Sequence, residues 1–271
     1  MYYTDKVILI TGASSGIGRE LALLLAKEQA WLILAARRAQ ALEEVQQACL
    51  QYTPRCETLI MDVTDEVSVE TGAKLALQFF GRIDVLVNNA GVTQRSLLID
   101  TPVSAVRKLM EVNFFGPVML TKALLPHFKT QQQGQVVVVS SMAGLMGYPW
   151  RSGYNAAKHA LQGYFETLQT EQPIPNLYTT IVCPGRIHTP ITYSAITATG
   201  EPFGHMDPGQ AHGIPVEKCA RRILTAMHKR KKLVMIARAE RLLLWFKRFF
   251  PPLFYFIARK GVNLPPAGTG R

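Results

Sequence analysis

The chain has 271 residues, of which 48% are hydrophobic, and a net charge of +11. This length and apolar content fit one large α/β domain or two small ones. The N-terminus runs straight into an apolar segment, so we expect no signal peptide. The four cysteines show no CxxC spacing and the histidines no HExxH motif, so we expect reduced thiols, no metal site and a cytoplasmic protein.

The positive charge is concentrated at one end of the chain. Residues 1–220 hold 17 Lys and Arg against 18 Asp and Glu, whereas residues 221–271 hold 13 Lys and Arg against Glu240 alone. The excess therefore lies in the last fifth of the sequence. No nucleic-acid-binding motif accompanies it, so we expect no nucleic acid partner.

Short apolar runs rich in β-branched residues alternate with segments of helical periodicity. This alternation predicts right-handed βαβ units. We therefore expect an α/β fold with a Rossmann-type, doubly wound parallel sheet of seven strands, helices on both faces, and a single domain over residues 1–237. The strands are expected at 7–10, 31–36, 58–63, 83–89, 136–141, 178–184 and 232–237.

A glycine-rich loop, TGASSGIGRE, follows the first strand and begins the first helix. Its glycines at 12, 16 and 18 depart from the G-x-G-x-x-G spacing of the common dinucleotide fingerprint. Their physical roles still fit, since glycines permit a tight turn, close approach of a pyrophosphate, and close helix–sheet packing. The helix N-terminus behind them offers free N–H groups to phosphates.

The end of the second strand indicates which dinucleotide binds. NAD-binding folds commonly place an acidic residue there for the ribose hydroxyls. Here the chain reads Ala35-Ala36-Arg37-Arg38, with two guanidiniums available for a 2′-phosphate. The alternative is a pair of solvated arginines at the start of the next helix. We expect NADP(H) in preference to NAD(H).

Residues 190–214 interrupt the alternation of strands and helices, since they contain four glycines, three prolines and many small polar residues. A long insertion just after the carboxyl end of a strand is where a segment covering the substrate would lie. We expect a substrate loop, with a merely tolerated surface loop as the alternative.

These features together resemble the short-chain dehydrogenase/reductase family over roughly residues 5–237. The loop TGASSGIG (11–18), the sequence NNAG (88–91) and a Tyr-x-x-x-Lys pair (154–158) occur in the family's order. The resemblance implies a catalytic set of Asn113, Ser141, Tyr154 and Lys158. It implies cofactor contacts at Gly12, Ser14, Ser15, Gly16, Ile17, Gly18, Arg37, Arg38, Asp62, Val63, Asn89, Ala90, Gly91, Tyr154, Lys158, Pro184, Gly185, Ile187 and Thr189.

The resemblance also implies the role of each catalytic residue. Tyr154 would exchange a proton with the substrate oxygen, and Lys158, one helical turn away, would bind the nicotinamide ribose and lower the tyrosine pKa. Ser141 would stabilise charge on that oxygen. Asn113 would kink its helix and hold a water that links Lys158 to solvent.

The sequence leaves the substrate open. We expect an NADP(H)-dependent oxidoreductase that interconverts a carbonyl and a secondary alcohol on a small apolar compound. The run from Arg151 to Glu171 further resembles a subgroup with membrane-attached members that act on steroids and other lipids. Met142, Leu145, Met146, Tyr148 and Trp150 either line a hydrophobic pocket or cover the core.

Two other functions remain as alternatives: a 3-oxoacyl-thioester reductase, whose acidic carrier would suit the basic C-terminal region, and a non-catalytic NADP(H)-binding scaffold. The intact catalytic set argues against the scaffold. Many relatives are dimers or tetramers, so the family resemblance also implies a homo-oligomer.

The C-terminal segment, residues 238–261, combines aromatic and basic residues. Residues 242–257 hold seven of the 24 aromatics of the chain. The run is split by two charges and by Pro251-Pro252, so we expect it not to span a bilayer. We expect peripheral attachment to an anionic membrane surface through residues 239–261. The alternative is that the aromatics are buried in a dimer interface or over the substrate pocket. Residues 262–271 are expected to be a flexible tail.

Overall fold

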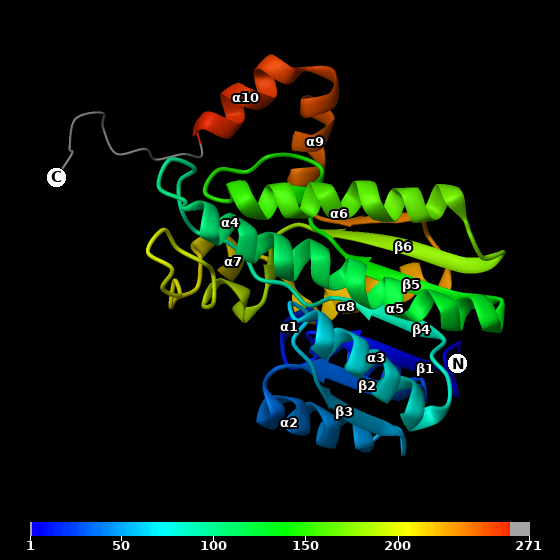
Figure 1. The fold of residues 1–271 in the computed structure, drawn as a ribbon. Helices are drawn as coiled ribbons and strands as arrows, with labels where there is room; N and C mark the ends of the chain where they lie inside the picture. Colours follow the sequence, from blue (N-terminus) through cyan, green and yellow to red (C-terminus); the bar gives the residue numbers. More distant parts are fainter. Residues whose placement is uncertain (1, 261–271) are drawn as a thin grey trace.

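A computed structural model describes residues 2–260, and it contains the expected seven-stranded parallel sheet. The strand order is β3-β2-β1-β4-β5-β6-β9, and every pairing is parallel (Figure 1). The fold is therefore the single-domain, Rossmann-type α/β fold predicted from the sequence. The strands are β1 Val7–Thr11, β2 Trp31–Ala36, β3 Cys56–Ile60, β4 Val85–Asn88, β5 Gln133–Val139, β6 Asn176–Pro184 and β9 Leu233–Ile236.

Helices cover both faces of the sheet. Central parallel strands are buried on both sides, which explains continuous apolar runs such as Val136–Val139. α1, α2 and α8 pack on one face, and α3, α5 and α6 pack on the other. Their bounds are α1 Gly16–Lys27, α2 Ala39–Leu50, α3 Glu66–Phe80, α4 Val103–Met110, α5 Gly116–Gln131, α6 Ser152–Glu171 and α8 Val216–His228.

Several strand boundaries differ from those predicted. β3 was expected at 58–63 but ends at Ile60, because Asp62 begins a turn in which its Oδ1 accepts hydrogen bonds from the Thr64 N–H and hydroxyl. β5 begins three residues earlier than expected, at Gln133. A two-stranded parallel sheet of β7 Ile187–His188 and β8 Ile214–Pro215 was not predicted, since two residues carry no readable periodicity.

The strand order reverses direction between β1 and β4, which is where this fold opens a ligand crevice at the carboxyl edge of the sheet. The two loops that follow these strands are joined at this edge. The Thr11 hydroxyl accepts hydrogen bonds from the backbone N–H groups of Asn89 and Ala90, each at 3.0 Å. The glycine loop and the NNAG sequence are thereby held side by side.

Two segments lie outside the layered core. Residues 190–214 contain a 3-10 turn, η3 Pro190–Thr192, and a short helix, α7 Pro208–Ala211. The C-terminal segment forms a hairpin of α9 Glu240–Phe249 and α10 Pro251–Lys260, drawn in orange and red in Figure 1. The expected tail at 262–271 lies outside the described residues. None of the helices in residues 2–260 is long and apolar enough to cross a bilayer.

Candidate active site

Asn113 lies in a π-helical turn, η1 Glu111–Phe115, that joins α4 to α5. Its side chain is fully buried, and its Nδ2 donates to the carbonyls of Leu109 and Val92, each at 3.0 Å. A side chain that takes the carbonyl four residues before it interrupts the regular helical ladder, which accounts for the widened turn. The expected distortion of the helix at Asn113 is present.

Tyr154 and Lys158 lie on the first turns of α6 and are both buried. The Lys158 Nζ is 5.8 Å from the centroid of the Tyr154 ring and donates to the Val139 carbonyl at 2.9 Å. Asn113 lies near the same place, because a Cβ on Gly91 would lie 2.9 Å from Asn113 Oδ1 and 3.8 Å from Lys158 Nζ. Three of the four predicted catalytic residues therefore meet at one point.

Ser141 completes the group from the carboxyl end of β5. Its Oγ accepts from the Ala143 N–H at 3.1 Å and donates to the Pro184 carbonyl at 3.3 Å. It also hydrogen-bonds the Tyr154 side chain. The structure thus brings together Asn113, Ser141, Tyr154 and Lys158 from β5, η1 and α6.

The pKa values of the buried pair follow their surroundings. Burial raises the pKa of Tyr154, while the hydrogen bond with Ser141 and the charge of Arg151 act against this. Burial lowers the pKa of Lys158 to about 8. The charge of Arg151 opposes the rise in the Tyr154 pKa, but burial outweighs it.

The glycine loop has the geometry of a surface that accepts a closely approaching ligand. Gly12 and Gly16 have φ of +64° and +56°, a region that L side chains rarely adopt. A Cβ at Gly18 would lie 2.5 Å from Gly12 O and from Asn89 Nδ2, so only glycine fits there. The Ser15 side chain makes no capping hydrogen bond, which leaves the first N–H groups of α1 available to an anion.

The two arginines after β2 lie beside this loop. Arg38 donates to the hydroxyls of Ser14 and Ser15 at 3.0 and 3.2 Å. Arg37 is 3.7 Å from the Asp62 carboxylate. Burial raises the pKa of Asp62, but the hydrogen bonds from Thr64 and the charge of Arg37 outweigh it, so the pKa is lowered overall.

The remaining predicted cofactor residues surround the same crevice. A Cβ on Gly16 would lie 3.4 Å from Thr189 Cγ2, so the segment after β6 closes on the glycine loop. Ile17 packs against one core cluster and Val63 against the other, on opposite faces of the sheet. The segment after β6 begins at Pro184-Gly185 and includes Ile187, which is buried in β7.

A cavity of about 230 Å³ adjoins Ser141. The sequence left open whether the apolar segment after Ser141 lines a pocket or covers the core, and the segment does both. The residues that line the cavity are Met142, Tyr148 and Trp150. Leu145 and Met146 pack in the core. The insertion at 190–214 and the C-terminal hairpin contribute the other walls. From the hairpin these are Glu240, Leu243, Phe254, Ile257 and Ala258.

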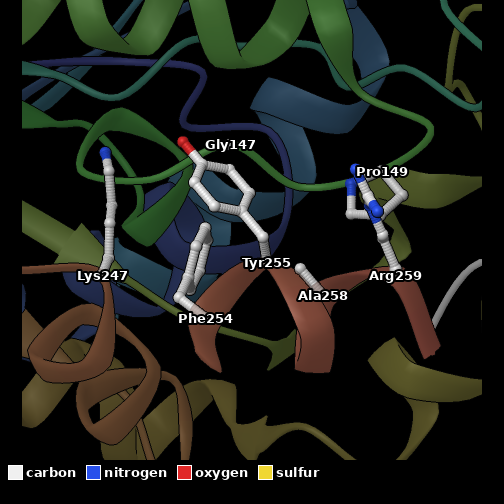
Figure 2. A pocket seen from close by; sticks show the side chains of 7 residues that line it. All are labelled: Gly147, Pro149, Lys247, Phe254, Tyr255, Ala258 and Arg259. Carbon is white, nitrogen blue, oxygen red and sulfur yellow. The ribbon is translucent and has the colours of Figure 1, made fainter. Parts of the chain in front are cut away.

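The hairpin faces the loop after Ser141 across a second hollow of about 320 Å³ (Figure 2). This hollow shares Gly147, Pro149, Phe254 and Ala258 with the cavity beside Ser141. Lys247 anchors the hairpin by donating to the Leu145 carbonyl at 2.7 Å. Part of the C-terminal segment therefore forms a wall of the cavity, the alternative left open by the sequence.

Sequence reasoning missed three residues at this site. The Gln94 Oε1 accepts from the N–H groups of Gly153 and Tyr154, at 2.8 and 3.2 Å, and so fixes the start of α6. Arg151 and Glu240 line the cavity. Gln94 and Glu240 belong to no motif and reach the site only through the tertiary fold, whereas Arg151 lies three residues before Tyr154, at the start of the run from Arg151 to Glu171.

Comparison with known proteins agrees with this geometry. Residues 6–199 match the sequence model described as short chain dehydrogenase, and the chain belongs to that family. Human dehydrogenase/reductase SDR family member 7 is 40% identical over 265 residues, which cover 95% of this chain and 78% of the relative. Member 7B from Bos taurus is 39% identical over 261 residues, covering 94% of this chain and 80% of the relative. The protein is an oxidoreductase of this family.

Solved structures share the fold. A short-chain dehydrogenase/reductase from Burkholderia phymatum, in complex with NAD, superposes with a TM-score of 0.83 at 23% identity, covering 93% of this chain and 96% of that one. An alcohol dehydrogenase from Thermococcus sibiricus, complexed with 5-hydroxy-NADP, has a TM-score of 0.72 at 26% identity, covering 85% and 95%. These neighbours thus include both an NAD complex and an NADP-type complex.

Proposed function

We propose that the protein is an NADP(H)-dependent oxidoreductase that interconverts a carbonyl and a secondary alcohol on an apolar, lipid-like substrate. The observation that carries this proposal is the convergence of Ser141, Tyr154 and Lys158 beside the cavity that Ser141 lines. A 3-oxoacyl-thioester reductase would use the same three residues. The partly apolar walls formed by Leu243, Phe254 and their neighbours favour a lipid-like substrate instead.

The catalytic residues would act on the substrate oxygen. Tyr154 donates or accepts the proton at this oxygen, and the raised pKa of its phenol keeps it protonated and ready to donate in the reductive direction. The Ser141 hydroxyl donates a hydrogen bond to the same oxygen and stabilises the charge that develops there. Lys158, whose pKa of about 8 lies near neutrality, can return a proton to Tyr154.

The dinucleotide would lie between the glycine loop and Lys158. Gly12 and Gly18 leave room that a Cβ would fill, the first N–H groups of α1 would hold the pyrophosphate, and Arg37 with Arg38 would bind the 2′-phosphate. When bound, the cofactor supplies or accepts the hydride at the substrate carbon.

Replacing Tyr154 with phenylalanine tests the function. Tyr154→Phe removes only the proton donor, so kcat should fall about 10²–10⁴-fold. The measurement is NADPH absorbance in a screen of steroids, retinoids, acyl thioesters and simple ketones. NADPH binding, followed by fluorescence titration, should be unchanged in the variant.

Met142→Leu serves as the matched control, because it changes a cavity residue without removing a polar group. It should keep kcat within the same order of magnitude. Near wild-type turnover in Tyr154→Phe would contradict the mechanism, and a wild-type chain that turns over only acyl thioesters would support the alternative function.

We propose further that the outer face of the C-terminal hairpin rests on an anionic membrane surface. Its aromatic residues Trp245, Phe249, Phe250 and Phe256 are 48–61% exposed, although their rings are large and apolar. The exposed Arg241 and Arg248 belong to α9, the helix that carries Trp245 and Phe249, and such a mixture of basic and aromatic residues suits the boundary between headgroups and acyl chains. The opposite face of the hairpin forms the cavity wall, so this arrangement gives a lipid-like substrate a short path to Ser141.

A further inference from the structure

The cavity beside Ser141 carries an uneven set of charges. Its lining includes three arginines, Arg95, Arg151 and Arg186, and two carboxylates, Asp207 and Glu240. Asp207 is paired with Arg95 at 2.9 Å, and Glu240 accepts a hydrogen bond from the backbone N–H of Arg186 at 3.1 Å. The cavity thus has one more cation than it has carboxylates, and among residues 2–260 neither the Arg151 nor the Arg186 guanidinium forms an ion pair with a carboxylate.

Arg151 is half-buried, and its side chain has no hydrogen-bond or ion-pair partner among residues 2–260. It occupies the N-cap position of α6, where Ser, Thr, Asp or Asn is preferred and where the helix dipole already contributes positive charge. Within residues 2–260, the side chain that caps the first N–H groups of α6, those of Gly153 and Tyr154, is the neutral amide of Gln94. An unpaired cation at a positive helix end opposes local stability, and such conflicts are expected at functional sites.

A second polar group without a partner lies in the same cavity. The Tyr148 hydroxyl oxygen is buried and has no hydrogen-bond partner in the part of the chain that the structure describes. Burial raises the pKa of Tyr148, with the negative charge of Glu240 adding to the rise and the charges of Arg186 and Arg151 opposing it. The hydroxyl therefore stays protonated, and it can donate a hydrogen bond to a ligand.

The rest of the wall is apolar and includes Met142, Leu243, Phe254 and Ile257. The half-buried Arg151 guanidinium and the buried Tyr148 hydroxyl both belong to this lining, and neither has a partner among residues 2–260. One carboxylate bound by both would supply the missing partners, because a guanidinium binds carboxylate oxygens in a bidentate manner. We propose that Arg151 and Tyr148 form a subsite for a carboxylate, and that the substrate is an apolar carbonyl or alcohol compound that carries one. This inference refines the proposed function and rests on it for the reaction at Ser141 and Tyr154.

Binding of an unreactive carboxylate tests the subsite without hydride transfer. Octanoate and methyl octanoate are titrated into the full chain saturated with NADPH, and binding is measured by calorimetry. Octanoate should bind more tightly than its ester, because only the acid engages the guanidinium. Arg151→Met should weaken octanoate binding about ten- to hundredfold, the loss expected for hydrogen bonds to a charged group, and leave the ester unchanged.

Matched variants separate the subsite from charge on the protein surface. Arg248→Met removes an exposed arginine of α9 that does not line the cavity, and it should leave octanoate binding unchanged. Tyr148→Phe removes a hydroxyl that has no partner in the fold, so the variant should fold like the wild type and weaken octanoate by about tenfold. Arg151→Lys keeps the charge and should retain part of the affinity.

Three results would overturn the subsite: equal binding of octanoate and its ester to the wild type, equal loss in Arg151→Met and Arg248→Met, or unchanged octanoate binding in both Arg151→Met and Tyr148→Phe. Failure of the proposed reaction gives a different pattern. In that case Tyr154→Phe and the wild type both lack turnover, while octanoate still binds in an Arg151-dependent manner.

Discussion

The buried amine of Lys158 makes the stability of the protein depend on pH. Its pKa in the folded chain is about 8, against 10.5 for the free side chain, and burial is the main cause. Below pH 8 the folded state carries the full cost of burying the charge. As the pH rises from 8 to 10.5 the unfolded state binds more protons than the folded state, so the free energy of unfolding rises with pH through this window.

In the wild type, the free energy of unfolding should rise by about 3 kcal/mol between pH 8 and pH 10.5 because of Lys158. Lys158→Met has no amine to titrate, so this variant should lack the rise. Urea unfolding at a series of pH values measures both proteins. Lys74→Met, at an exposed position of α3, should keep the wild-type dependence. Identical pH profiles for the wild type and Lys158→Met would contradict the assignment of the buried charge.

At the scale of single residues, the sequence predicted those whose roles depend on a motif. Ser141, Tyr154 and Lys158 meet in the structure because a strand end and one helical turn fix their positions. Arg151 and Gln94 were missed for a physical reason. Their importance arises from what they do or do not contact across the fold, and neither burial nor an unmet hydrogen bond can be seen in a linear pattern.

At the scale of elements, the loop after β1 and the end of β2 lie side by side, and we propose that they bind the cofactor together. Arg38 holds Ser14 and Ser15, and Arg37 lies by Asp62, so both guanidiniums border the glycine loop. A bound 2′-phosphate would accept charge-assisted hydrogen bonds from the two guanidiniums. These bonds would replace the exposed contacts of Arg38 with the serine hydroxyls and of Arg37 with Asp62. Such a bond contributes about 1.5–3 kcal/mol.

The double variant Arg37→Ala/Arg38→Ala should therefore bind NADPH about ten- to hundredfold more weakly, with little change for NADH. Fluorescence titration with each nucleotide gives the ratio, and the two single variants assign the effect. Arg55→Ala removes one positive charge just before the amino end of β3, away from the carboxyl end of β2. It should leave the NADPH/NADH affinity ratio unchanged. If the double variant also keeps the wild-type ratio, the phosphate site lies elsewhere.

The helices and strands could be predicted from the sequence to different degrees. All seven strands of the main sheet were predicted, because each contains a short apolar run and most of these runs are separated by segments of helical periodicity. β7 and β8 were not, because they pair only when the segment after β6 closes back on itself. The C-terminal helices were expected to carry aromatics on a surface, but their second role as a cavity wall depends on the angle at which the hairpin packs.

At the scale of the whole molecule, the hairpin divides its apolar residues between two surfaces. Phe254 is buried in the core and lines the cavity, whereas Trp245, Phe249 and Phe250 are exposed and contact one another as a ring cluster. The net positive charge is confined to the same end of the chain. Burial against the cavity accounts for the first group of side chains but not for the exposed cluster or for the charge.

Membrane attachment accounts for both, because rings enter the acyl region while each Lys or Arg near anionic lipid contributes about 1 kcal/mol. Sedimentation with phosphatidylserine-containing vesicles at low salt should carry the full chain into the pellet, and neutral phosphatidylcholine vesicles should carry less. The triple variant Trp245→Ser/Phe249→Ser/Phe250→Ser should remain in the supernatant, since it removes the exposed cluster and leaves the cavity wall intact.

Truncation of the chain before α9 would be a poorer test, because it would also remove the cavity wall and the Glu240 contacts that hold the segment after β6. A better control is Val67→Ser/Phe79→Ser, which removes exposed apolar side chains from α3 and should pellet like the wild type. Raising the salt should release the wild type, since the attraction between basic side chains and lipid is screened within about 10 Å at 0.1 M. If the wild type stays in the supernatant with anionic vesicles at low salt, the membrane proposal is wrong. The exposed rings would then be the contact between copies of the chain, and the triple variant should lower the oligomeric state measured by light scattering.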